Sequence, residues 1–400
     1  MQGVFRAFLG IAVAAGIQLA CSIQAPADAS LETRAQGGDV TAQTQLGLHY
    51  VAGDGGYDKD YNQAAYWLKK ASDQGNARAM TNLGLLYWDG NGVPQDLSIT
   101  RALFEKAAKL GYAAADNDLG IMDSDEHTPE GDAAAVVLYQ KAIGLGYKWA
   151  YNGLAIMYEE GRGVPEDAAK AEKYYEVAWA AGAKGAAPNL CALMLREQRY
   201  TQAISWCAKT PDKPVPDYNM AWMYAFGKGT PQNYAAARVW YGRCAQLGKI
   251  NCAYAIGRLY EMGLGGPKDL STAMGWFNTA VRGGDPSAMF EEASLYVQGG
   301  VVPQDFPAAH KLFLAAAIQG HYAAKVNLGT LYEHGLGVDA DLVTAQAWYT
   351  LALMQGRTPE ALASWQRIDK RLTDAERERV KALAQQLLAQ YGPALFNSIE

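Results

Sequence analysis

Small and large side chains recur along the chain with a period close to 36 residues. A small residue followed three positions later by a Tyr or its substitute marks nine anchors, separated by 37, 36, 35, 36, 30, 36, 36 and 36 residues. The anchors are Tyr50, Tyr87, Asp123, Tyr158, Met194, Tyr224, Tyr260, Tyr296 and Tyr332. The small residues before them are Gly47, Gly84, Gly120, Ala155, Cys191, Ala221, Gly257, Ala293 and Gly329. Nine copies in phase indicate a repeat protein.

A second pair of columns lies later in each copy. Its bulky members are Trp67, Leu103, Leu138, Tyr174, Trp206, Trp240, Trp276, Leu312 and Trp348, and a small residue stands three positions before each of them. Residues three apart share one face of a helix. The columns therefore predict two helices per copy that approach closely through their small residues, while the large rings fill the seam between neighbouring pairs.

Polar residues and glycines mark the helix ends. In seven of the nine copies an Asp or Asn lies seven positions before the bulky residue of the second column, at Asp60, Asp96, Asp167, Asn233, Asp269, Asp305 and Asp341. This is the position of a helix N-cap, whose side-chain oxygen accepts otherwise unbonded backbone N–H groups. Gly-rich turns such as 89–94 and 160–165 precede the caps and predict the end of each first helix.

The fifth copy, at about residues 183–217, is irregular because it is six residues short and lacks the Gly-rich turn. Pro211, Pro214 and Pro216 predict a break in the helix over 210–217. This break could divide the repeats into a front and a rear part with changed curvature between them. It could equally be a deletion without consequence, since repeat arrays tolerate irregular copies.

After the ninth copy the period stops and two ordinary helices are predicted within 357–400. The first begins at Thr358 and Pro359, and the second begins at a capping box, Thr373 with Glu376, and stops at Gly392. Their many charged residues suit a polar cap that closes the exposed end of a repeat array.

With these columns, turns and caps, the chain resembles the Sel-1-like repeat family, relatives of the tetratricopeptide repeats, over about residues 38–356. The resemblance implies an all-α fold, a right-handed alpha-alpha superhelix (solenoid) of nine repeats with a C-terminal helical cap. It implies that the first helices line a concave surface. It also implies an adaptor or regulator that binds other proteins.

Composition and the first residues bear on the compartment. The chain is 50% hydrophobic and 11% aromatic, too apolar for a disordered protein, and its net charge of −6 argues against a nucleic-acid partner. Arg6, an apolar stretch over 7–20 and the small residues Ala27 and Ala29 predict a signal peptide over 1–29, followed by a short mature segment over 30–37. The protein is expected to be periplasmic or secreted. Cys21 partly resembles a lipobox, so a lipid anchor at the membrane is the alternative to cleavage before Ser30.

Four cysteines remain after Cys21, and an even set in an oxidising compartment predicts two disulfides. Cys244 and Cys252 flank one tight turn, with a spacing similar to that of the Helicobacter cysteine-rich branch of the family, which implies a disulfide between them. Cys191 and Cys207 are expected to face each other across the fifth helix pair and to form the second bridge.

No pattern of catalytic or metal-binding residues stands out. The five histidines form no zinc motif, and the chain has no phosphate loop, dinucleotide fingerprint or nucleophile elbow. The acidic pairs Glu159–Glu160 and Glu291–Glu292 are interpreted as solvated or partner-facing carboxylates. We therefore expect no catalytic residue, no metal and no cofactor.

The leading hypothesis is an exported scaffold or regulator that binds a partner protein or peptide on the concave face. Relatives suggest envelope signalling, exopolysaccharide or secretion systems. Trp88, Trp149 and Trp222 fall outside the repeat columns and are candidate contacts, although each could instead pack between copies. The alternative is a beta-lactam- or peptidoglycan-acting hydrolase of the cysteine-rich type. The sequence sets neither the partner nor the oligomeric state.

Overall fold

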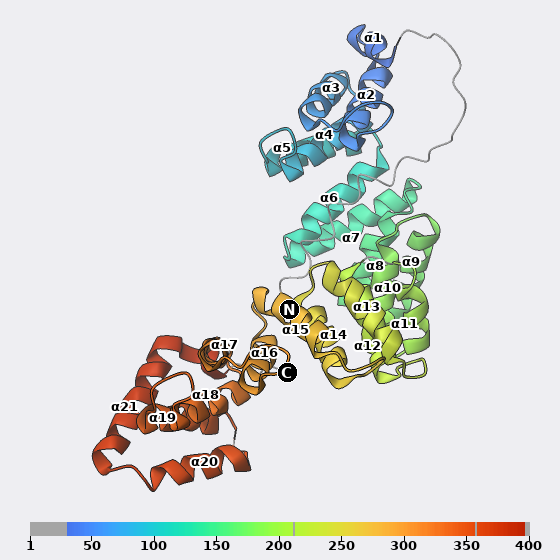
Figure 1. The fold of residues 1–400 in the computed structure, drawn as a ribbon. Coiled ribbons are helices and arrows are strands. Elements are labelled where there is room, and N and C mark those ends of the chain that lie inside the picture. Colours follow the sequence, from blue (N-terminus) through green and yellow to red (C-terminus); the bar gives the residue numbers. More distant parts are fainter. Residues whose placement is uncertain (1–29, 211–212, 357, 397–400) are drawn as a thin grey trace. The chain divides into compact units, whose positions relative to one another are not determined.

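The computed structural model describes residues 30–210, 213–356 and 358–396, and all regular structure in these ranges is helical (Figure 1). The predicted signal peptide, with Cys21, lies outside the described residues. A short helix α1 (Leu31–Gln36) comes before nine helix pairs. The pairs are α2 (Val40–Ala52) and α3 (Tyr61–Asp73), α4 (Ala77–Asp89) and α5 (Leu97–Lys109), α6 (Ala113–Asp125) and α7 (Pro129–Gly144), α8 (Ala150–Glu160) and α9 (Ala168–Ala180), α10 (Ala186–Arg196) and α11 (Tyr200–Cys207), α12 (Pro214–Phe226) and α13 (Tyr234–Gln246), α14 (Ile250–Met262) and α15 (Leu270–Arg282), α16 (Pro286–Gln298) and α17 (Phe306–Ile318), and α18 (Tyr322–His334) and α19 (Leu342–Gln355).

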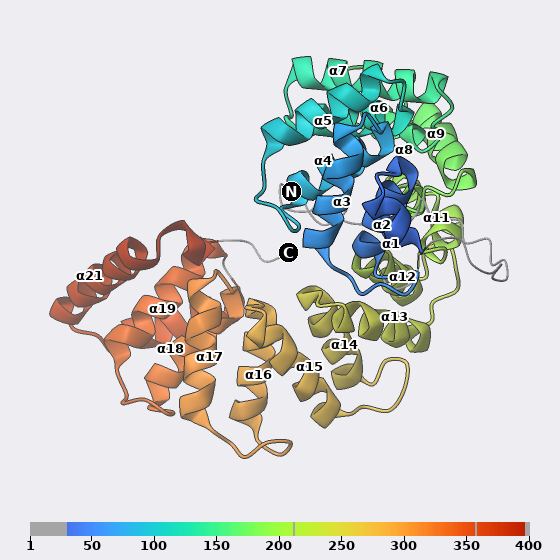
Figure 2. The same cartoon turned by 90° about the horizontal axis from the view of Figure 1, so that it is seen from above.

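Contacts between helices divide the chain into one unit that ends at Gln198 and another that begins at Arg199. Within each unit, helices that follow one another in the sequence pack side by side (Figures 1 and 2). The boundary falls inside the irregular fifth copy, between α10 and α11. The predicted all-α fold of consecutively paired helices is confirmed, and within the described residues no helix is both long and apolar enough to cross a bilayer.

The small columns are buried as predicted, but the large side chains that pack on them lie one position later than predicted. A methyl group added to Gly84 would lie 2.5 Å from the ring of Phe104, and one added to Gly329 would lie 2.6 Å from the ring of Tyr349. Successive residues of a helix point about 100° apart, so a shift of one position selects another face. The buried column is Leu68, Phe104, Tyr139, Tyr175, Cys207, Tyr241, Phe277, Phe313 and Tyr349. The predicted column flanks it, and only its members Trp67 and Trp348 are buried.

All seven predicted N-caps are confirmed. The Asp96 carboxylate accepts the backbone N–H groups of Ser98 and Ile99 at 2.9 and 3.0 Å, and the backbone N–H of Asp96 donates to the Tyr87 carbonyl at 2.9 Å. The cap therefore begins the second helix and closes the turn onto the first helix.

The Gly-rich turn of one copy packs on the preceding copy. Gly92, in the turn between α4 and α5, has a φ of +67°, and a Cβ there would lie 2.3 Å from the Tyr61 carbonyl at the start of α3. Only glycine allows this close approach in a left-handed conformation. The turn thus covers the beginning of the second helix of the copy before it.

The break predicted over 210–217 is shorter than expected, because α12 begins at Pro214 and includes Pro216. Both prolines lie in the first turn of a helix, where their missing N–H groups would have no helical partner in any case. Helix α1 was not predicted; Ser30 caps it and Ala35 is buried.

At the other end, α20 (Pro359–Asp369) and α21 (Asp374–Tyr391) are confirmed with their caps, including the box of Thr373 and Glu376. A 3-10 turn, η3 (Gly392–Phe396), follows and was not predicted. It places Leu395 in a core cluster with residues of α17 and α18.

Candidate functional site

A groove of about 560 Å³ opens between the second and third copies. Its walls come from the last residues of α4 and α6 and from one face of α5. The lining residues are Trp88, Leu97, Ser98, Arg101, Ala102, Glu105, Met122, Asp125 and Glu126. A volume of this size suits a few side chains of a bound segment.

The groove exists because the third copy has no Gly-rich turn. Helix α6 ends at Asp125 and α7 begins at Pro129, so that only residues 126–128 connect them. In five other copies the second glycine of the turn presses on the first residues of the preceding second helix, as Gly92 does on Tyr61 and Gly163 on Asp132. In the described part of the chain no such glycine covers the start of α5.

Leu97, the first residue of α5, is uncovered as a result. It is 53% exposed. The residues at the same position of the other eight second helices are all half-buried: Tyr61, Asp132, Ala168, Tyr200, Tyr234, Leu270, Phe306 and Leu342. The exposure of this leucine is thus particular to the groove.

The groove holds one cation among several carboxylates. The Arg101 guanidinium donates to Asp123 at 2.7 Å and to Glu126 at 2.9 Å. Glu105 and Asp125 form no ion pair within the described residues. Neighbouring protein atoms partly desolvate the Asp125 carboxyl and raise its pKa, and this effect exceeds the opposite influence of nearby charges. The groove is therefore acidic.

The three tryptophans that the sequence singled out do not lie together. Trp88 lines the groove, with its ring centroid 5.9 Å from that of Phe104. Trp149 precedes α8, and its indole N–H donates to the Ala181 carbonyl at 2.7 Å, so it fastens one copy to the next. Trp222 belongs to the second unit and packs 5.7 Å from the ring of Phe226, which is 60% exposed.

Sequence reasoning missed Leu97, Arg101 and Asp125 as groove residues. A signal was present, because the stretch Asp125 to Thr128 lacks the Gly-x-Gly pattern that follows most first helices. In the alignment of the nine copies, the missing turn of the third copy is the one that would cover Leu97 at the start of the preceding second helix.

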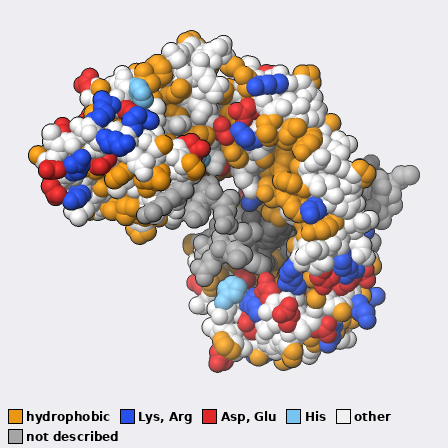
Figure 3. All heavy atoms as spheres, turned by 90° about the horizontal axis from the view of Figure 1, so that it is seen from below, with side chains coloured by type: hydrophobic (Ala, Val, Ile, Leu, Met, Phe, Trp, Pro, Cys, Tyr) orange, Lys and Arg blue, Asp and Glu red, His pale blue; other side chains and the backbone are white. Residues whose placement is uncertain are grey.

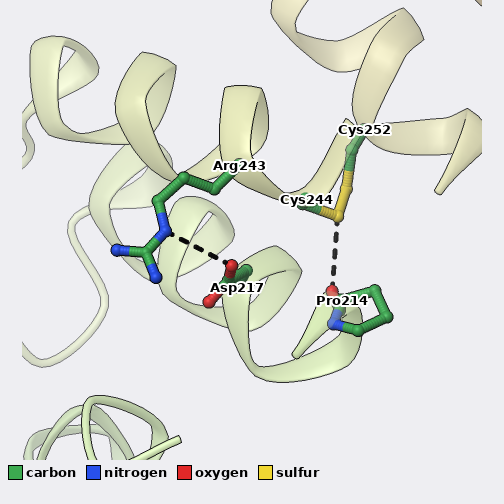
Figure 4. The surroundings of a disulfide bond; sticks show 5 residues. All are labelled: Pro214, Asp217, Arg243, Cys244 and Cys252. Atoms are coloured by element: carbon green, nitrogen blue, oxygen red, sulfur yellow. Dashed lines mark hydrogen bonds and ion pairs between the residues drawn. A yellow bond between two sulfur atoms is a disulfide. The ribbon is translucent and has the colours of Figure 1, made fainter. Parts of the chain in front are cut away.

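Cys244, at the end of α13, and Cys252, at the start of α14, form a disulfide across the turn between the two helices (Figure 4). The Cys244 sulfur lies 3.3 Å from the Pro214 carbonyl oxygen, and one turn further on Asp217 pairs with Arg243 at 3.5 Å. This is the bridge that the family resemblance implies, and its neighbours belong to the packing of α12 on α13. Cys191 and Cys207 lie in different units, so their bridge stays a prediction.

The acidic pairs are less exposed than expected. Glu159 accepts the Tyr175 hydroxyl at 2.5 Å, and Glu291 accepts from Arg258 at 2.8 Å. Glu292 is only 4% exposed, so the interpretation of this residue as a solvated carboxylate is wrong. It lies on the buried face of α16 because its position in the repeat faces the core. Among the described residues, no three metal-binding side chains come together.

Figure 3 shows one face of the molecule, on which hydrophobic side chains gather in a band and acidic and basic side chains lie interspersed with one another.

A family model described as Sel1 repeat matches seven segments of the chain, 40–76, 77–112, 150–182, 217–249, 250–285, 286–321 and 323–356. The third and fifth copies are not among them. One curated relative is the ERAD-associated E3 ubiquitin-protein ligase component HRD3A of Arabidopsis thaliana, 40% identical over 62 residues, which are 16% of this chain and 9% of that protein. The aligned part is therefore a small fraction of that relative.

Two solved structures are similar over most of the chain. The crystal structure of c5321, a protective antigen of uropathogenic Escherichia coli strains with an SLR fold, is 25% identical with a TM-score of 0.56, and the match covers 92% of this chain and 95% of that one. A Sel1 repeat protein from Oxalobacter formigenes is 24% identical with a TM-score of 0.37, over 87% of this chain and 98% of that one.

Proposed function

The chain belongs to the Sel1 repeat family, whose members are protein-interaction scaffolds, and we propose that it is an exported scaffold or regulator that binds a partner protein or peptide. The observation that carries this proposal is the groove beside Trp88. Single exposed leucines are common on protein surfaces, but Leu97 lies in a hollow next to a tryptophan, where a side chain of a partner would be buried.

The periplasmic location rests on the signal-peptide pattern of the first 29 residues. The mass of the mature N-terminus tests it directly. Cleavage before Ser30 supports an exported protein, and a lipid on Cys21 supports an anchored one. An unprocessed chain that stays with the cytoplasmic fraction would contradict both.

A role inside a larger assembly fits the relative HRD3A, an ERAD-associated E3 ubiquitin-protein ligase component. For this chain we propose an assembly of the cell envelope, in signalling, exopolysaccharide or secretion. The hydrolase alternative has a simple test, because turnover of nitrocefin by the purified protein would favour an enzyme over a scaffold.

Site-specific photo-crosslinking tests the groove in the cell. A benzophenone amino acid at position 97 should crosslink a partner protein, because Leu97 lies at the edge of the groove. The matched control is Val137 on α7, another large apolar residue, which is 63% exposed and does not line the groove. Equal crosslinking at both positions, or none at position 97, would overturn the proposal that the groove binds a partner.

A further inference from the structure

We propose that the groove takes a basic segment of a partner protein, with an Arg or Lys beside an apolar side chain. The cationic group would lie between Glu105 and Asp125, and the apolar side chain would pack on Trp88 and Leu97. This inference rests on the proposed function and specifies the class of partner.

The same chain shows how an equivalent groove is filled. One copy later, the Gly-rich turn of the fourth copy covers the start of α7 and places Arg162 there. The Arg162 guanidinium donates to the Asp132 carboxylate at 2.5 Å and to the carbonyl oxygen of Ser124. In the repeat alignment, Ser124 corresponds to Trp88, and Asp132 corresponds to Leu97. A short segment that carries an arginine thus fills the equivalent groove one copy later.

Arg101 supports the idea that a covering segment is missing. Its counterpart in the sixth copy, Arg238, holds the next Gly-rich turn by donating to the carbonyl oxygens of Gly266 and Pro267, both at 3.4 Å, and to that of Leu259 at 2.9 Å. Arg101 has no turn to hold and binds the carboxylates of Asp123 and Glu126 instead. The side chain that would otherwise fix a covering segment is already neutralised.

Charge favours a cationic occupant over an anionic one. Arg101 is shared between two carboxylates, which leaves Glu105 and Asp125 uncompensated by an ion pair within the described residues. Two helices, α4 and α6, also end at the groove, and a helix C-terminus carries partial negative charge. The face of the Trp88 ring adds a further attraction for a guanidinium or ammonium group.

Peptide binding measured by fluorescence anisotropy tests the inference. The probes are a fluorescein-labelled hexapeptide of alternating Leu and Arg and a matched peptide with Glu in place of each Arg, both at physiological salt so that long-range attraction is screened. The Arg peptide should bind and the Glu peptide should not. The double variant Glu105→Gln with Asp125→Asn should weaken binding about tenfold. Glu166→Gln, an exposed acid outside the groove, should leave binding unchanged.

A second variant fills the groove and keeps the carboxylates of Glu105 and Asp125. In it, residues 90–95, the turn of the second copy, replace Glu126 and His127, so that the third copy regains a Gly-rich turn. The variant should lose binding of the Arg peptide while its helical circular dichroism is retained. If it does not fold, Leu97→Arg, which places a positive charge at the edge of the groove, gives the same expected loss.

Several results would overturn the inference. These are equal binding of both peptides, no binding of the Arg peptide even at millimolar concentration, and undiminished binding to the double variant. If sedimentation shows that the wild-type protein is a dimer and that the variant with the added turn is a monomer, the groove binds a second copy of this chain. A partner crosslinked at position 97 through a segment without basic residues would refute this inference and leave the proposed function intact. No crosslink at that position would refute the proposed function itself.

Discussion

Replacing Glu292 with Met should stabilise the second unit of the protein at neutral pH. Glu292 lies on α16 at a position that is apolar in the other eight copies: Leu46, Leu83, Leu119, Leu154, Leu190, Met220, Ile256 and Leu328. The residue is 4% exposed, and among the described residues its Oε2 atom has no hydrogen-bond partner. The fold therefore holds a carboxyl group where it holds a hydrocarbon in every other copy.

The expected magnitude follows from three contributions. An unsatisfied buried acceptor costs about 1–3 kcal/mol, and the substitution removes it. The buried Met side chain contributes about 1.5 kcal/mol or more from its transfer out of water. The loss of the hydrogen bond from Asn278 to the carboxyl opposes these gains by about 1 kcal/mol. We expect a net stabilisation of about 2 kcal/mol at pH 7.

The stabilisation should depend on pH with a defined sign. Burial raises the pKa of Glu292 in the folded protein, more than the Asn278 hydrogen bond lowers it. A carboxyl with a raised folded pKa contributes its full stability below its unfolded pKa, near 4.3 for an ordinary Glu, and loses it as the pH rises through the folded pKa. The advantage of Glu292→Met should therefore be smallest near pH 4 and grow toward neutral pH.

Urea unfolding followed by circular dichroism at about pH 4.5, 6 and 7.5 measures the difference in free energy of unfolding between the variant and wild type. These values begin near the unfolded pKa of Glu and extend upward from it. Glu291→Met is the matched control on the same helix, because Glu291 accepts from Arg258 and its replacement removes an ion pair. The control should be neutral or destabilising. A Glu292→Met protein that is less stable than wild type at pH 7.5, or a gain that does not vary with pH, would refute the reasoning.

Three further predictions concern other contacts. Gly92→Ala should cost about 3 kcal/mol, because its Cβ would meet the Tyr61 backbone, whereas Gly75→Ala, at a φ of +88° with open space around it, should cost only about 1 kcal/mol; thermal unfolding compares them. Burial lowers the pKa of Lys325 to about 8, because the folded protein disfavours the protonated amine. Wild type should therefore gain stability relative to Lys325→Met as the pH rises from about 8 to about 10. Urea unfolding across this range checks the sign of the change in free energy of unfolding. Replacing both Cys244 and Cys252 with Ser should lower the free energy of unfolding by about 2 kcal/mol. A reductant should then lower the free energy of unfolding of this variant by less than it lowers that of wild type.

The parts of the fold that the sequence predicts best are those set by local chemistry. Asp96 is recognisable as an N-cap because its carboxylate bonds to N–H groups two and three residues later, so no distant contact is involved. The capping box of Thr373 and Glu376 is equally local. The small columns are predictable as well, because close approach of helices requires small residues wherever the partner helix lies.

The ring column was missed because it depends on how two helices cross. Trp67 is the larger side chain and repeats as Trp in several copies, but the space above Gly47 is filled by Leu68, which lies against it. Which of two neighbouring residues enters that space is decided by the rotation of one helix against the other. The same limit explains Glu292, since the residue type suggests solvent and only the column position reveals the core.

The groove arises from a change that leaves the repeat period almost intact. The fifth copy loses six residues and its step falls to 30, so the irregularity is obvious in the sequence. The third copy also lacks its turn, yet its step to the next anchor is 35, because α7 is 16 residues long where α5 has 13. Residues that form a turn elsewhere form extra helix here. Since stacking depends on the buried columns and not on the turns, the third copy could lose its turn, and so open a groove beside Trp88, without disturbing the helices that carry it.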